Sequence, residues 1–144
     1  MPAVPTTDPF ALSRFETAQR DVIDQVRAEL RARCKSSHWM WFIFPQLAGL
    51  GSSAMARRYA LSGIDEARAL LAHPVLGVRL LECSVLLLAV RERSAEEILG
   101  VVDAQKLRSS MTLFALAAPE EAVFRRVLEK YCDGQLDHKT MERA

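Results

Sequence analysis

Apolar residues recur along most of this chain at the spacing of amphipathic helices. Between residues 21 and 33, Val22, Ile23, Val26 and Leu30 follow helical spacing, while charged residues, Glu29 among them, are assigned to the opposite face. Similar patterns predict helices near residues 9–18, 53–60, 62–72, 94–99, 104–116, 119–131 and 139–143. About eight helices and no convincing strand indicate an all-α fold in a single domain, residues 8–144.

Polar residues at the expected helix ends support this assignment. Asp8 precedes a proline that suits a first helical position, and Ser94 with Glu97 has the spacing of a capping box. Asp103 and Asp137 are predicted to cap two later helices. Residues 1–7 contain two prolines and small residues, which predicts a flexible N-terminal lead-in.

The segment 74–91 is apolar on every side. Its residues Val75, Leu76, Val78, Leu80 and Val85 leave no polar face wide enough to meet solvent. It is therefore predicted to be the longest helix and the central, buried one.

Residues 36–46 form the densest aromatic stretch of the chain and contain both tryptophans. Ser36 and Ser37 can cap a short helix, and Pro45 would end it because the residue before a proline is disfavoured in helical geometry. A buried strand is the alternative, since the segment is almost wholly apolar. A helical turn is favoured because no partner strand is found elsewhere in the sequence.

Composition narrows the class of protein. The chain has 144 residues, half of them hydrophobic, and a net charge of +1, which lacks the basic excess typical of proteins that bind a nucleic acid duplex. Three widely separated cysteines favour a reducing compartment. No signal peptide is recognisable, and the longest charge-free apolar run, residues 83–90, is too short to span a bilayer. We therefore expect a cytoplasmic protein with no membrane partner; the oligomeric state is left open.

Common catalytic motifs are missing from the sequence. It contains no P-loop, no HExxH and no GxSxG, and its three histidines lack the spacing of metal ligands. No metal site and no cofactor are predicted.

Polar residues placed among apolar ones are the candidates for a site. They occur near the aromatic stretch, after the Gly49-Leu50-Gly51 loop and within residues 106–114. If these segments converge, aromatic walls, hydroxyls and cationic heads would suit a nucleotide-like or other anionic ligand. His38 is the candidate acid or base. The candidate ligand-binding residues are Ser37, Trp39, Trp41, Gln46, Arg57, Arg58, Lys106, Ser109, Ser110 and Thr112.

Each candidate also has a purely structural interpretation. The tryptophans can be core residues and His38 can be a capping residue. Arg57 and Arg58 can be solvated, and Ser109 and Ser110 can allow close helix packing. Gln46 can hold a loop, and Lys106 can be an exposed helix lysine.

The sequence closely resembles the DUF1810 family of bacterial proteins of unknown function. The resemblance is carried by HWMWFIFPQ at 38–46, Gly49-Leu50-Gly51, AMARRYA at 54–60, HPVLG at 73–77 and KLRSSMTLF at 106–114. It covers nearly the whole chain, from residue 8 to about residue 140. Some members of this family bear the label calpastatin, but this compact apolar chain lacks the disordered repeats which that name implies.

A more distant resemblance is to the helical YbiA/NADAR-like proteins, which act on N-glycosidic bonds of ADP-ribose derivatives. The resemblance implies acidic residues in the pocket, yet residues 36–51 and 105–118 contain no carboxylate. The sequence thus favours a helical domain that binds a small nucleotide-like or anionic ligand. An N-glycosidase-type hydrolase and a non-enzymatic interaction module are the alternatives, and whether the protein is an enzyme is left open.

Overall fold

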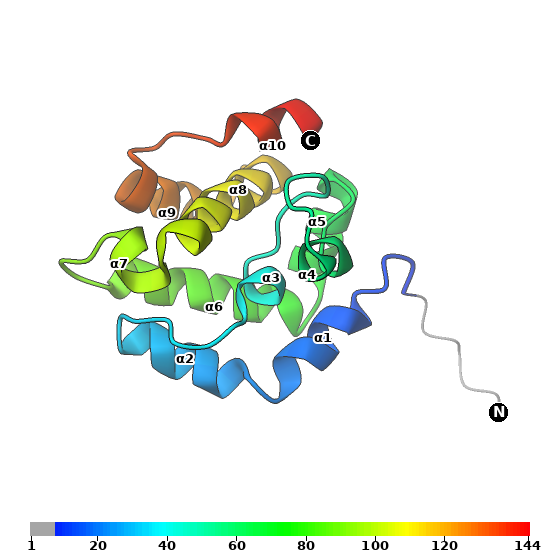
Figure 1. The fold of residues 1–144 in the computed structure, drawn as a ribbon. Coiled ribbons are helices and arrows are strands. Elements are labelled where there is room, and N and C mark those ends of the chain that lie inside the picture. The colour runs from blue at the N-terminus through cyan, green and yellow to red at the C-terminus, as the bar shows by residue number, and fades with distance from the viewer. Residues whose placement is uncertain (1–7) are drawn as a thin grey trace.

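Ten helices and no strand make up residues 8–144, the part of the chain that the computed structural model describes (Figure 1). The all-α class is confirmed, with ten helices where about eight were expected. The predicted lead-in, residues 1–7, lies outside the described residues. The helices are α1 (Ser13–Arg20), α2 (Ile23–Arg31), α3 (Met40–Ile43), α4 (Ala54–Arg58), α5 (Ile64–Ala72), α6 (Leu76–Ala89), α7 (Ala95–Leu99), α8 (Val101–Ala117), α9 (Ala122–Cys132) and α10 (His138–Arg143).

The helix with the most buried residues is α8, and not α6 as the apolar pattern predicted. α8 is the longest, with 17 residues, and its residues 109–115 are all buried, because α5, α7, α9 and α10 pack around it. α6 has 14 residues, and Val78 and Val85 on its outer side are 62% and 55% exposed. Its all-round apolarity therefore includes a face that meets solvent.

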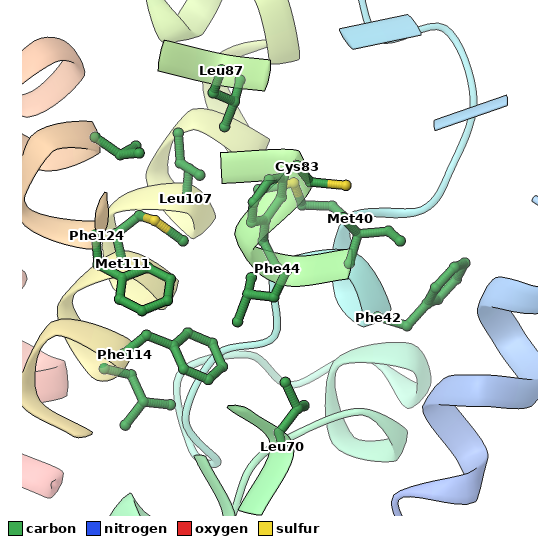
Figure 2. Close-up of a cluster of buried hydrophobic side chains, with 14 of the residues drawn as sticks. Met40, Phe42, Phe44, Leu70, Cys83, Leu87, Leu107, Met111, Phe114 and Phe124 are labelled. Atoms are coloured by element: carbon green, nitrogen blue, oxygen red, sulfur yellow. The ribbon is translucent and has the colours of Figure 1, made fainter. Parts of the chain in front are cut away.

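The core gathers side chains from α1, α2, α3, α5, α6, α7, α8 and α9. Figure 2 shows Phe44, at the end of α3, among Cys83 of α6 and Met111 and Phe114 of α8. The aromatic stretch does form a helical turn, α3, as predicted, and Phe44 and the buried Pro45 follow it. α3 lies against α1 and α6, so the stretch enters the core from one side of the molecule.

Several predicted helix ends are confirmed in detail. The Ser94–Glu97 capping box forms at α7, and the Asp137 carboxylate accepts a hydrogen bond from the Thr140 N–H at α10. The predicted helix start at Asp8 and Pro9 was wrong, because α1 begins only at Ser13. The Asp8 carboxylate instead holds the turn before α1, where it accepts from the N–H groups of Ser13 and Leu12, which lowers the pKa of Asp8.

Asp103 is not the cap that the sequence suggested. It lies in the first turn of α8, whose N-cap is Gly100 at φ 89°. A positive φ favours glycine, so the chain turns at Gly100 and α8 starts directly after it. The helix therefore begins three residues earlier than expected.

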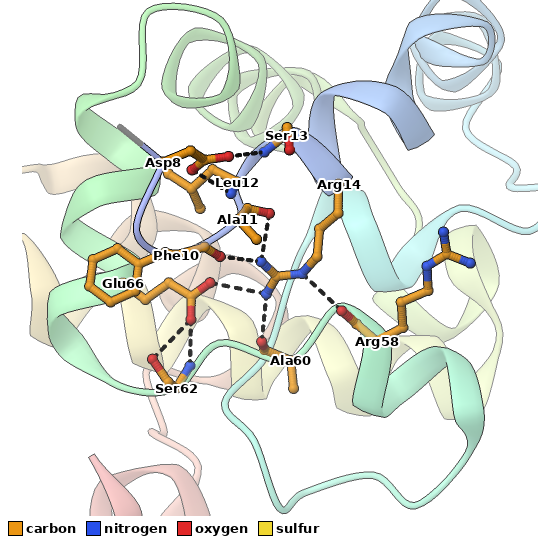
Figure 3. Close-up of polar contacts among 10 residues, drawn as sticks. All are labelled: Asp8, Phe10, Ala11, Leu12, Ser13, Arg14, Arg58, Ala60, Ser62 and Glu66. Carbon is orange, nitrogen blue, oxygen red and sulfur yellow. Dashed lines mark hydrogen bonds and ion pairs between the residues drawn. The ribbon is translucent and has the colours of Figure 1, made fainter. Parts of the chain in front are cut away.

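Arg14 fastens the N-terminal segment to α4 and α5 (Figure 3). Its guanidinium forms an ion pair with the buried Glu66 at 3.0 Å. It also donates to the backbone carbonyls of Phe10, Ala11, Arg58 and Ala60. The end of α4 and the chain that follows it are thereby held in place beside α1.

No single helix among residues 8–144 is long and apolar enough to cross a bilayer. α5 and α6 reach that length only together, and they are bent by 91° at the break between them.

Candidate ligand-binding site

A buried carboxylate, Glu29 of α2, organises the start of the aromatic stretch. It is 4% exposed and accepts hydrogen bonds from the N–H groups of Ser36 and Ser37, from the Ser37 hydroxyl and from Trp39 Nε1 at 3.0 Å. Burial by itself would raise the pKa of this carboxyl. The hydrogen bonds from Ser37, Ser36, Gln25 and Trp39 outweigh that effect and lower the pKa to about 2.

The assignment of Glu29 to the solvent face was therefore wrong. Its spacing from Val22 and Val26, seven and three residues, is that of the apolar face of α2, which was the available signal. Two predicted ligand residues, Ser37 and Trp39, are engaged in this network. Trp39 is only 1% exposed, so the network holds the aromatic stretch in the core.

Three other predicted ligand residues do meet in one place. A cleft of about 430 Å³ is lined by Gln46 from the segment after α3 and by Lys106 and Ser109 from α8. α10 packs against α8 (Figure 1), and residues at its start complete the wall. The full lining is Gln46, Leu50, Gly51, Val101, Val102, Gln105, Lys106, Ser109, Asp137 and Lys139.

A much smaller cavity, of about 10 Å³, lies where the aromatic stretch meets α8. It shares Gln46 and Lys106 with the cleft, and its remaining lining is Met40, Trp41, Phe44, Ala56 and Tyr59. A space of this size is about that of one water position. Within the described residues the buried Trp41 Nε1–H has no hydrogen-bond partner. Trp41 therefore lines this cavity with an indole N–H that bonds no protein group.

Two lysines that share the carboxylate of Asp103 lie beside the two tryptophan rings. Lys106 Nζ lies 5.0 Å from the centre of the Trp41 ring and 3.7 Å from Asp103. Asp103 pairs more closely, at 2.9 Å, with Lys35, whose Nζ lies 5.2 Å from the Trp39 ring. Asp103 thus divides its charge between two lysines, and its shorter contact is to Lys35. Lys106 keeps positive charge for the cleft.

The cleft contains one carboxylate that the sequence did not assign to it. Asp137 was predicted only as a helix cap, yet it is 8% exposed and lines the cleft. Its Oδ2 accepts from the N–H and the hydroxyl of Thr140, and its own N–H donates to Thr112 Oγ1. Residues 105–118 contain no carboxylate, but α10 supplies one from a distant part of the chain.

The remaining predicted residues lie elsewhere. His38, Arg57 and Arg58 are exposed and line neither the cleft nor the small cavity. Thr112 is fully buried, where it donates to the Arg108 carbonyl and supports Asp137. Ser110 is also fully buried, and its hydroxyl has no partner within the described residues.

Two glycines let the loop after Gln46 approach its neighbours. A Cβ at Gly51 would lie 2.7 Å from Ala56 Cβ and 3.3 Å from Gln46 Nε2. Gly49 has a φ of +91°, and a Cβ there would lie 2.5 Å from Arg143 Nη1 of α10. The glycines thus permit the close packing that positions Gln46.

The helical architecture and the segments that build this cleft are those of one family. The model of the family described as "Protein of unknown function (DUF1810)" matches residues 9–144, so this chain belongs to the DUF1810 family. The chain is similar to a solved structure, the conserved hypothetical protein Rv1873 from Mycobacterium tuberculosis, at 52% identity and a TM-score of 0.92. The match covers 94% of this chain and 96% of that one.

No curated protein matches the chain. The family itself is one of unknown function, so neither match supplies an activity. The distant resemblance to YbiA/NADAR-like proteins stays a prediction.

Proposed function

We propose that the cleft between the 46–51 loop, α8 and the start of α10 binds a small nucleotide-like or other anionic ligand. The main observation behind this proposal is that Gln46 and Lys106 line both the cleft and the small cavity, with the Lys106 ammonium beside the Trp41 ring. The cleft volume, about 430 Å³, is within the range of small-molecule sites.

The chemistry of the lining supports an anion. Lys106 and Lys139 bring two positive charges to the cleft, and Asp137 brings one negative charge. The negative charge of Asp103, beside Lys106, is shared with Lys35. Leu50, Val101 and Val102 supply apolar surface on which a ring can rest. Both halves of a nucleotide-like ligand therefore find a matching surface.

Thermal unfolding with a panel of nucleotides tests the proposal. A ligand present at 100 times its Kd stabilises the folded state by about 2.7 kcal/mol, which raises Tm by several degrees. Lys106→Met should weaken binding about tenfold, since it removes an interaction with the anion worth about 1.4 kcal/mol. Arg126→Met, on the exposed side of α9, is the matched control and should bind as the wild type does. No shift with any nucleotide at millimolar concentration would overturn the proposal.

The hydrolase alternative is favoured by one observation, the presence of Asp137 in the cleft. A carboxylate is a group that can assist cleavage of an N-glycosidic bond. His38, the acid or base suggested by the sequence, does not line the cleft, so this alternative rests on Asp137. Release of free base from ADP-ribose derivatives, measured by chromatography, would support it, and intact substrate after prolonged incubation would exclude it.

The interaction-module alternative is favoured by the exposed apolar side chains of α6. Val78 and Val85 are seven residues apart and so lie on one side of that helix. This surface is separate from the cleft lining. If it is the functional one, replacing both valines with serine abolishes partner binding and leaves nucleotide binding unchanged.

We also propose that the protein is cytoplasmic. Cys34, Cys83 and Cys132 are all free thiols, the form that a reducing compartment maintains.

A further inference from the structure

Asp137 is held so that one carboxylate oxygen is fixed and the other is available. Two hydrogen bonds from Thr140 and one from Asp137 N–H to Thr112 fix the residue, and both contacts of its carboxylate engage Oδ2. Oδ1 forms no hydrogen bond within the described residues, and Asp137 as a whole is 8% exposed. The opening that reaches this residue is the cleft it lines. Oδ1 is therefore an unpaired acceptor on a firmly held residue that lines the cleft.

The surrounding charges select which donor this acceptor suits. A ligand ammonium would pair with Asp137, but it would also face the ammonium groups of Lys106 and Lys139 in the same cleft. A hydroxyl group donates to a carboxylate without that repulsion. The lysines at the same time attract an anionic group. The cleft therefore matches a molecule that carries both hydroxyls and negative charge.

We propose, resting on the function proposed above, that the ligand is a sugar phosphate in class, such as the ribose phosphate part of a nucleotide. Asp137 Oδ1 accepts hydrogen bonds from the ribose hydroxyls. Lys106 and Lys139 hold the phosphate. Gln46, which lines the cleft, meets the edge of the base.

Calorimetric titration with two probes tests this assignment on the full chain. Adenosine 5′-monophosphate and its 2′,3′-dideoxy analogue carry the same base and phosphate and differ in the hydroxyls. We expect the wild-type protein to bind the dideoxy probe at least about tenfold more weakly, because hydrogen bonds to a charged group are lost. Asp137→Asn keeps a side chain that can cap α10 and removes the charge, so the ratio between the probes should fall to about threefold or less.

Lys106→Met is the contrasting variant, since it should weaken both probes by the same factor and leave their ratio unchanged. Equal wild-type affinity for the two probes would overturn the sugar assignment and leave the proposed anion site standing. Failure of both probes to bind at millimolar concentration would overturn the proposed function and this assignment together. The wild-type comparison decides the question even if a variant does not fold.

Discussion

Two tryptophans separated by one residue have different tasks in this protein. Trp39 donates its Nε1–H to the buried Glu29, whereas Trp41 Nε1–H has no partner within the described residues and lies at the small cavity. The sequence suggested both as ligand residues, because the HWMWFIFPQ string gives them the same surroundings. Only the position of Glu29, on another helix, separates their roles.

The same substitution should therefore have opposite results at the two positions. Trp39→Phe leaves Glu29 with one donor fewer and should cost about 1–3 kcal/mol of unfolding free energy. Trp41→Phe removes an N–H that bonds no protein group, so its cost should stay below about 1 kcal/mol. Nucleotide affinity should fall, because the Lys106 ammonium loses the indole ring beside which it lies. Urea unfolding and calorimetric titration of both variants measure the contrast. Equal destabilisation by the two changes would contradict it.

Glu29 should also give the protein a particular response to acid. Its pKa is lowered from the ordinary value of 4.5 to about 2, so the folded state binds a proton less readily than the unfolded state does. The stabilisation is therefore complete above pH 4.5 and is lost as pH falls from about 4.5 towards 2; it amounts to roughly 3 kcal/mol.

Urea unfolding between pH 7 and pH 2.5 measures that response. Glu29→Gln should be less stable at pH 7 and should lose less stability on acidification than the wild type. Parallel stability curves for the two proteins would show that the hydrogen bonds to Glu29 do not favour its charged form.

At the scale of the element, helix positions and helix ends could be predicted well. Apolar spacing located α2, and short-range chemistry located the Ser94 capping box and the Asp137 cap, because each depends on neighbours within a few residues. The identity of the central helix could not be predicted. In an all-round apolar pattern such as that of α6, every face of the helix has a similar hydrophobicity. The pattern therefore does not indicate which face packs against the core.

The two faces of α6 should respond very differently to truncation. Leu80 is 2% exposed and Val78 is 62% exposed, although both belong to the same apolar run. Leu80→Ala should cost about 2–5 kcal/mol, because it removes buried methyl groups and leaves a cavity. Val78→Ala should change stability by no more than about 0.5 kcal/mol. Denaturant unfolding of the two variants decides between this arrangement and a fully buried α6, in which both changes would be costly.

At the scale of the whole molecule, the site depends on contacts that no local pattern encodes. Gln46, Lys106 and Ser109 could be named as candidates because each is a polar residue in an apolar segment. Their meeting in one cleft, and the arrival of Asp137 from α10, depend on how α8 and α10 pack. His38 and Arg58 had equally suggestive sequence surroundings, yet the fold leaves them exposed and outside the cleft.

Gly51 offers a way to change the site through packing alone, without touching a charged group. An alanine Cβ there would lie 2.7 Å from Ala56 Cβ and 3.3 Å from Gln46 Nε2, so the loop must shift. We expect Gly51→Ala to cost about 1–3 kcal/mol of stability and to weaken nucleotide binding, because Gln46 leaves the junction of the cleft and the small cavity.

Gly63→Ala is the matched control, since a Cβ at Gly63 would have no atom within 4 Å. Its backbone, at φ 169°, is extended and open to any residue. This variant should keep wild-type stability within about 0.5 kcal/mol and bind the same nucleotide with unchanged affinity. If Gly51→Ala lowers stability and leaves affinity intact, Gln46 is a loop-holding residue and the ligand is bound by α8 and α10 alone.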